Sequence, residues 1–206
     1  MLINIDYDGV VVDSLGRLVR LACIAHDQLG LGRPATEADF QTLETLSFPH
    51  LARKVEVPAD DVERFADKMF ALQAEDHTLP PVFGEMPGIL KRLSNAHRLV
   101  VVTSSLSQEV EAVLKLHSFD DSISLILDGQ DRRPKSAKIK LAMERFGFAS
   151  RETYMIGDAR SDVREGKLAG VKTVAVTWGF HKRDFLGLER PDFLVDSPGE
   201  LASLFA

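Results

Sequence analysis

The chain has 206 residues, 45% of them hydrophobic and 27% charged, a composition typical of a globular protein with a sizeable core. Its net charge of −6 argues against binding to nucleic acid or to an anionic membrane surface. The single cysteine excludes an internal disulfide framework, and no apolar run is long enough for a transmembrane helix. Because the opening residues also lack the basic region of a secretory signal, we expect a cytoplasmic protein.

The first predicted element is a short buried strand that ends at two acids. An apolar segment at residues 2–5 stops at Asp6 and Asp8, and Gly9 follows. A glycine directly after a strand marks a turn in which the backbone comes close to another group. Open α/β sheets bind their ligands at the carboxyl ends of the strands. Two carboxylates crowded there need a cation, a shared proton or strong hydrogen-bond donors.

The next stretch is predicted to be entirely helical. Apolar spacing predicts a helix over 14–30, and a capping-box pattern opens a second helix over 36–46. A third helix begins near Pro58, and the prolines at 80 and 81 end the pattern. We therefore expect an all-helical insert that covers residues 14–83.

After Gly84, predicted strands alternate with predicted helices. We expect strands at residues 99–102, 123–127, 154–156, 173–176 and 193–195. We expect helices over residues 107–117, 136–146 and 161–169, and two more that begin at residues 87 and 198. This alternation is typical of parallel βαβ units with right-handed crossovers. The predicted fold class is α/β: a doubly wound, parallel, Rossmann-like core (1–13 and 84–206) with the helical insert as a cap directly above the strand-end acids.

Three of the predicted strands end in polar residues, which the fold places on one edge of the sheet: Asp6 and Asp8, Thr103 and Ser104, and Asp158 and Asp162. The four-residue step from Asp158 to Asp162 runs into a helix start, so both carboxylates can face one point. We expect Asp6, Asp8, Asp158 and Asp162 to form a cluster of carboxylate oxygens, which suits Mg²⁺ because this ion prefers oxygen ligands, keeps several waters and is commonly bound with a phosphate. The pattern therefore points to phosphate chemistry.

Four short motifs give the chain a family resemblance: residues 6–10, 102–104, 135 and 157–162. In this order they resemble the haloacid dehalogenase-like superfamily, over the whole chain. The stretch 170–180 and the position of the helical insert resemble the phosphoglycolate phosphatase-like branch of that superfamily, whose members carry a helical cap. Val10 stands where the first motif more often has threonine.

The resemblance implies a role for each motif residue. Asp6 is the expected nucleophile, which forms an aspartyl phosphate, and Asp8 is the expected general acid and base. The expected Mg²⁺ ligands are the carboxylates of Asp6 and Asp158, the main-chain carbonyl of Asp8, and Asp162 directly or through water. The phosphoryl oxygens are expected to meet Thr103, Lys135 and the N–H groups near Tyr7 and Ser104.

Several alternatives remain open at this stage. Arg133 and Lys138 compete with Lys135 for the third motif, because the order here is Arg132-Arg133-Pro134-Lys135. A phosphomutase of this fold has a cap histidine where this chain has Leu18, and a phosphonate-cleaving relative needs a reactive cap lysine, for which Lys54 is the candidate. A non-catalytic binding protein is a third alternative, in which loss of Asp6 or Asp8 would be expected.

The expected activity is that of a Mg²⁺-dependent phosphatase. Its partner is a small phosphorylated metabolite, with phosphoglycolate as one candidate, and the protein is expected to be a monomer or homodimer. The six histidines show no metal-ligand spacing, and we expect all of them at the surface or at helix caps.

Overall fold

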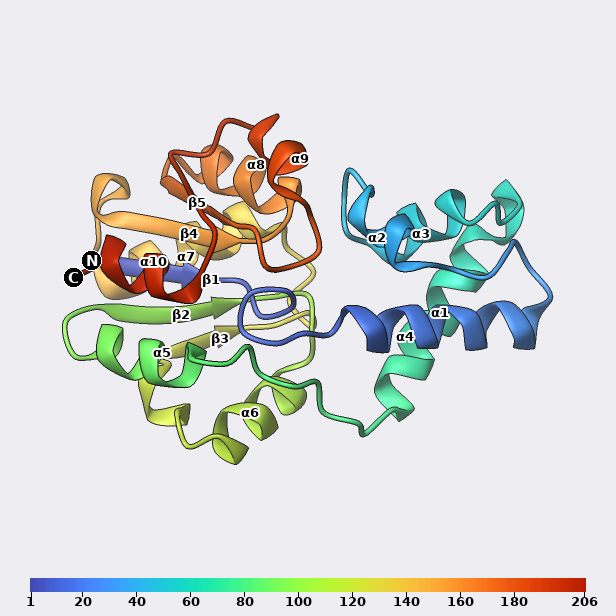
Figure 1. The fold of residues 1–206 in the computed structure, drawn as a ribbon, viewed down its shortest axis with the longest axis horizontal. Helices are drawn as coiled ribbons and strands as arrows, with labels where there is room; N and C mark the ends of the chain where they lie inside the picture. Colours follow the sequence, from blue (N-terminus) through green and yellow to red (C-terminus); the bar gives the residue numbers. More distant parts are fainter. The chain divides into compact units, whose positions relative to one another are not determined.

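The computed structural model describes all residues from Met1 to Ala206 and divides into two compact units. One unit combines Met1–Asp13 with Pro81–Ala206, and the other is Ser14–Pro80 (Figure 1). Residues 81–83, predicted as part of the insert, belong to the first unit instead. There the Asp13 N–H donates to the Pro81 carbonyl and the Phe83 N–H donates to the Val11 carbonyl.

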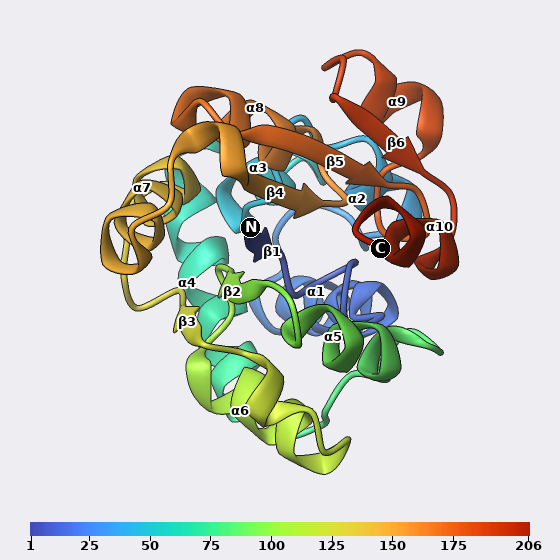
Figure 2. The ribbon, with the colours of Figure 1, turned by 90° about the vertical axis from the view of Figure 1, so that its left-hand side faces the viewer.

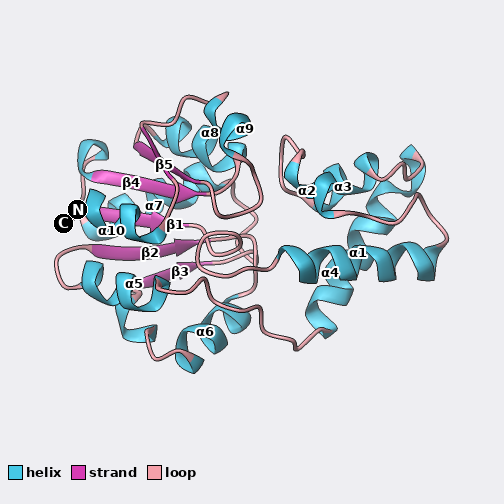
Figure 3. Ribbon diagram, in the orientation of Figure 1, coloured by secondary structure: helices cyan, strands magenta, loops and turns pink.

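The first unit contains one parallel sheet of six strands in the order β3-β2-β1-β4-β5-β6 (Figure 3). The strands are β1 (Leu2–Ile5), β2 (Arg98–Val102), β3 (Leu125–Leu127), β4 (Thr153–Gly157), β5 (Lys172–Val176) and β6 (Phe193–Val195). In the register, Ile5 pairs with Val101 of β2 and Ile156 of β4. The residue after Ile5 is Asp6, so the central strand delivers this acid between the ends of its two neighbours. The predicted doubly wound α/β core is confirmed.

Helices cover both faces of this sheet (Figure 2). They are α5 (Met86–Ser94), α6 (Ser107–Leu116), α7 (Lys135–Phe146), α8 (Arg160–Ala169), α9 (Arg183–Gly187) and α10 (Pro198–Leu204). Helices α7 and α8 pack side by side on one face, and α5 and α10 lie on the other. A sheet covered on both faces needs strands that are apolar throughout, and all four residues of β1 are buried.

The second unit contains helices only. They are α1 (Leu15–Leu29), α2 (Glu37–Gln41), α3 (Phe48–Lys54) and α4 (Val62–Glu75), which follows a 3-10 turn at Ala59–Asp61. Helix α4 packs against α1 and α3, and Leu51, Phe65 and Met69 are fully buried. None of the helices in either unit is long and apolar enough to cross a bilayer.

Most predicted elements are present, with three differences. The helix predicted over 36–46 is only α2, five residues long, and the strand predicted from 123 begins at Leu125. Helices α3 and α9 were not predicted as separate elements. Both are short, at seven and five residues, and so carry too few turns for a periodic apolar pattern.

Gly166 tests how closely α8 packs against the sheet. A Cβ at this position would lie 2.7 Å from Thr173 Cγ2 and 3.1 Å from Met155 Cβ, so we expect Gly166→Ala to lower the free energy of unfolding by about 1–3 kcal/mol through overpacking. Gly88 on α5 is the matched control, because nothing lies within 4 Å of its added Cβ. Gly88→Ala should raise stability by up to about 1 kcal/mol. Urea unfolding of both variants measures the difference, and equal effects would contradict this packing.

Candidate active site

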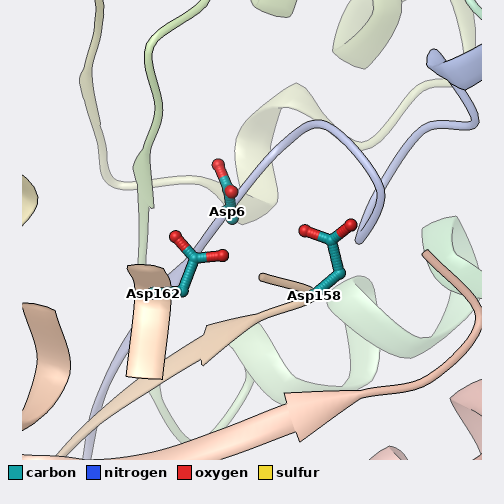
Figure 4. A group of neighbouring side chains, drawn as sticks. All are labelled: Asp6, Asp158 and Asp162. Carbon is teal, nitrogen blue, oxygen red and sulfur yellow. The ribbon is translucent and has the colours of Figure 1, made fainter. Parts of the chain in front are cut away.

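Three buried carboxylates meet at the carboxyl edge of the sheet (Figure 4). Asp6 directly follows β1, Asp158 directly follows β4, and Asp162 lies in the first turn of α8. Each offers an oxygen within 4.8 Å of the others, and none is more than 6% exposed. The structure thus brings together Asp6, Asp158 and Asp162, as the sequence predicted from their strand-end positions.

Each carboxylate has its own main-chain donor. Asp6 Oδ1 accepts from the Tyr7 N–H at 2.8 Å, and Asp158 Oδ2 accepts from the Phe180 N–H at 2.7 Å. Asp162 Oδ2 accepts from the Ala159 N–H at 3.1 Å, so this acid also caps the start of α8. Asp162 is favoured at this position, because the unpaired N–H groups and the helix dipole attract negative charge there.

Glycines make the close approach of these acids possible. Gly9 has a φ of 72°, which strains other residues, and a Cβ there would collide with the Asp158 carboxylate. A Cβ at Gly179 would collide with the same carboxylate, and one at Gly157 with the Asp162 side chain. The sequence predicted that the backbone at Gly9 comes close to another group, and that group is the Asp158 carboxylate.

Lys135 is the ammonium that contacts this cluster. Its Nζ lies 2.6 Å from Asp6 Oδ2 and 2.6 Å from Asp162 Oδ1. Burial opposes its charge, but Asp162 and Asp6 together hold the pKa of Lys135 above its usual value. The two alternative residues contact other groups. Arg133 is exposed and pairs with Asp131, and the Lys138 ammonium donates to the main-chain carbonyls of Thr103 and Asp128.

The second predicted strand end forms a tight loop. Thr103 is fully buried, and its Oγ1 accepts from the Ser105 N–H at 2.9 Å. Ser104 is exposed, and Lys138 Nζ donates to the Thr103 carbonyl at 3.0 Å. The Tyr7 side chain is buried, and its main-chain N–H is the group that donates to Asp6.

Asp8 differs from the other acids of the site. The sequence placed its carboxylate in the same cluster, but Asp8 is partly exposed, and its side chain is not among the three that cluster. Ser105 Oγ donates to Asp8 Oδ2 at 2.5 Å. Ser105 was not singled out from the sequence, although it follows Thr103 and Ser104 at the same strand end.

Burial and the neighbouring carboxylates disfavour charge on Asp6 and Asp158. Burial raises the pKa of Asp6 to about 7; Lys135 opposes this shift, and Asp162 and Asp8 add to it. Burial, followed by the charges of Asp162 and Asp6, raises the pKa of Asp158 well above its ordinary value. One lysine therefore does not neutralise the site.

The donor set fits a small divalent cation. All the clustered side chains offer oxygen, the ligand type that Mg²⁺ prefers. Asp158 Oδ1 is buried and has no hydrogen-bond partner, an arrangement that costs free energy unless a cation occupies the position. Asp6, Asp158 and Asp162 are thus the side chains that can hold Mg²⁺.

Of the two positions expected for the histidines, the surface does not apply to His181, which is fully buried and contacts the first residue of α8. Its ring Nδ1 accepts from the Arg160 N–H at 3.0 Å, and its main-chain N–H donates to the Asp158 carbonyl at 3.3 Å. His181 therefore bonds the main chain on both sides of Ala159, where β4 passes into α8. The only sequence signal was its position in the loop after the strand at 173–176.

Comparisons with known proteins match this architecture. The sequence model of the haloacid dehalogenase-like hydrolase family matches residues 3–176 of this chain. The chain is 26% identical over 200 residues to a phosphoglycolate phosphatase of Synechococcus elongatus, covering 95% of this chain and 92% of the relative. It is 32% identical over 113 residues, 53% of each chain, to the pyrophosphatase PpaX of Bacillus mycoides. A haloacid dehalogenase-like hydrolase structure from Streptococcus pneumoniae superposes with a TM-score of 0.86 at 19% identity, over 100% of this chain and 98% of that one.

The raised pKa of Asp6 predicts how stability depends on pH when divalent ions are chelated. An acid whose pKa is higher in the folded protein stabilises the fold when protonated, and this contribution is lost as the pH rises through the folded value of about 7. The metal-free protein should therefore gain about 2 kcal/mol of stability from Asp6 between pH 7.5 and 5.5. Asp6→Asn should lack this gain. Urea unfolding in chelator at both pH values measures it, and parallel pH profiles for the two proteins would contradict it.

Mg²⁺ should stabilise the folded protein through the same acids. A hundredfold excess over the dissociation constant adds about 2.7 kcal/mol, so the midpoint of thermal unfolding should rise by several degrees. Asp158→Asn should remove most of this rise. The matched control is Asp120→Asn, which removes the same charge from an exposed position and should respond to Mg²⁺ like the natural protein. An undiminished rise in Asp158→Asn would exclude Asp158 as a ligand.

Proposed function

The chain belongs to the haloacid dehalogenase-like hydrolase family, and on that premise we propose that this phosphatase-type hydrolase cleaves small phosphate monoesters with Asp6 as nucleophile and Mg²⁺ as cofactor. The observation that carries the proposal is the group of three buried carboxylates with Lys135 at the carboxyl edge of the sheet. Phosphoryl transfer depends mainly on positioning and charge neutralisation, which these acids would supply together with Lys135 and a bound cation.

In the first step, an Asp6 carboxylate oxygen attacks phosphorus, and the bond from phosphorus to the ester oxygen breaks. Asp8, in its acid form, gives its proton to the departing oxygen, which leaves as the alcohol. The Tyr7 N–H and the Lys135 ammonium hold Asp6 from two sides. Lys135 favours the ionised form of Asp6, which is the form that can attack.

In the second step, a water oxygen attacks phosphorus of the aspartyl phosphate. Its proton passes to the Asp8 carboxylate, the bond from phosphorus to Asp6 breaks, and inorganic phosphate is released. Asp8 is then an acid and Asp6 a carboxylate, as at the start. The same residue serves as acid and base, because each step leaves it in the form that the next one needs.

The remaining polar groups bind the transferring phosphoryl oxygens. Asp6, Asp158, Asp162 and the Asp8 main-chain carbonyl would hold Mg²⁺, which when bound supplies positive charge against those oxygens. Lys135 and the N–H groups near Tyr7 and Ser104 add further donors. The Thr103 hydroxyl accepts from the Ser105 N–H and keeps its own proton to donate to the phosphoryl group.

The substrate is proposed at the level of its class. The relatives carry the names phosphoglycolate phosphatase and pyrophosphatase, so phosphoglycolate and pyrophosphate are the first compounds to test. Leu18 disfavours a mutase, and Lys54 is an exposed residue at the end of α3, which disfavours a phosphonate-cleaving reaction. A binding protein without activity is disfavoured because Asp6 and Asp8 are both present.

Release of phosphate from p-nitrophenyl phosphate tests this proposal. We expect steady turnover with Mg²⁺ and none in the presence of chelator. Asp6→Asn should lower turnover by at least about 10³-fold, because it removes the nucleophile and leaves only assistance from binding. Asp120→Asn, with the same change at an exposed position, should leave turnover unaltered. Activity in Asp6→Asn close to that of the natural protein would overturn the assignment.

A further inference from the structure

The Ser105 side chain connects Asp8 to the loop after the neighbouring strand, β2. Ser105 Oγ donates to Asp8 Oδ2 at 2.5 Å, although the two residues are 97 positions apart in the sequence. Ser105 is only 3% exposed, while Asp8 is partly exposed. The buried serine thus meets the more accessible acid from the interior of the protein.

Ser105 is itself held by its main chain. Its N–H donates to Thr103 Oγ1 at 2.9 Å, and its carbonyl accepts from the Gly129 N–H at 2.9 Å. A Cβ at Gly129 would collide with the Ser104 carbonyl, so the loops after β2 and β3 lie in direct contact. The hydrogen bonds to Thr103 and Gly129 both involve main-chain atoms of Ser105, so they fix the direction of its Cα–Cβ bond.

A buried lysine fastens the same two loops. Lys138 on α7 is 3% exposed, and its Nζ donates to the Thr103 carbonyl at 3.0 Å and to the Asp128 carbonyl at 2.7 Å. The ammonium therefore joins the residues that follow β2 and β3, two positions before Ser105 in the sequence. The loop that carries the Ser105 hydroxyl is thus held at several main-chain atoms.

The proposed mechanism requires Asp8 in two protonation states, and the chemistry of its partner must suit both. A hydroxyl donates to a carboxylate and can rotate to accept from a carboxylic acid. An ammonium or a main-chain N–H can only donate and would favour the ionised form alone. Serine is therefore a partner that can hold Asp8 throughout the reaction cycle.

We propose that Ser105 is the positioning residue of Asp8: its hydroxyl holds the carboxyl in one orientation while Asp8 gives a proton to the leaving oxygen and later takes one from water. This inference rests on the proposed function and deepens it. Ser105 itself touches neither the nucleophile nor the phosphorus in this scheme. Its loss should therefore weaken proton transfer and spare the attack by Asp6.

Two substrates that differ in their leaving groups separate this role from a general loss of structure. Phenolate is a poor leaving group that needs a proton, whereas p-nitrophenolate departs without one. With Mg²⁺ present, Ser105→Ala should lower kcat/KM about 10- to 100-fold for phenyl phosphate, part of the 10²–10⁴ that general acid catalysis supplies. For p-nitrophenyl phosphate the loss should be less than about threefold.

Two further variants complete the test. Ser105→Thr retains the hydroxyl and should recover most of the loss on phenyl phosphate. Ser122→Ala, at a buried serine beside the start of β3, is the matched control and should leave the ratio of the two kcat/KM values unchanged. In an Asp8→Asn background, Ser105→Ala should cause no additional loss on phenyl phosphate, because the two residues act as one unit.

Two results would count against the proposal in different ways. An equal loss on both substrates in Ser105→Ala, or an additional loss in the Asp8→Asn background, would overturn the role of Ser105 while leaving the phosphatase function intact. Absence of phosphate release from either substrate by the natural protein would overturn the proposed function and the role of Ser105 together.

Discussion

The site depends on the repulsion between carboxylates that the fold forces together. Parallel pairing of β1 with β4 brings the residues after both strands to one edge of the sheet, and α8 returns Asp162 to the same point. The acids stay there because each accepts from a main-chain N–H and because Lys135 lies between two of them. The stability that holds them comes from elsewhere, from a sheet whose central strand is buried on both faces.

This arrangement leaves the site short of positive charge, which favours the binding of a cation. Burial raises the pKa values of Asp6 and Asp158, which means that the folded protein holds these groups in an unfavourable state. A cation that binds there relieves the strain, so part of its binding free energy comes from the repulsion built into the fold. Active sites commonly carry such a stability cost, because a site optimised for the fold alone would not attract a charged cofactor.

The sequence predicts those features that depend on local order along the chain. The strand at residues 2–5, the alternation after Gly84 and the meeting of Asp6, Asp158 and Asp162 all follow from short patterns and from the rule that parallel strands end at one edge. Features that depend on distant packing were missed. Ser105 contacts Asp8 only because β2 pairs with β1, and His181 is buried only because its loop folds back on Asp158. The roles of the site residues stay predictions, because the structure gives the positions of these residues and does not test their chemistry.

The two acids of the first motif have different surroundings, and these suit the different tasks that we propose for them. Asp6 is buried beside an ammonium, which opposes the effect of burial and favours the ionised form. Asp8 is partly exposed and has the neutral hydroxyl of Ser105 as a partner. A nucleophile needs its lone pair unprotonated when it attacks, whereas a general acid and base must change its protonation state in every cycle. A charged partner suits the first requirement and a neutral partner that both donates and accepts suits the second. In the proposed mechanism, the division of labour therefore comes from the side chains contributed by α7 and by the loop after β2, because the acids themselves are chemically the same.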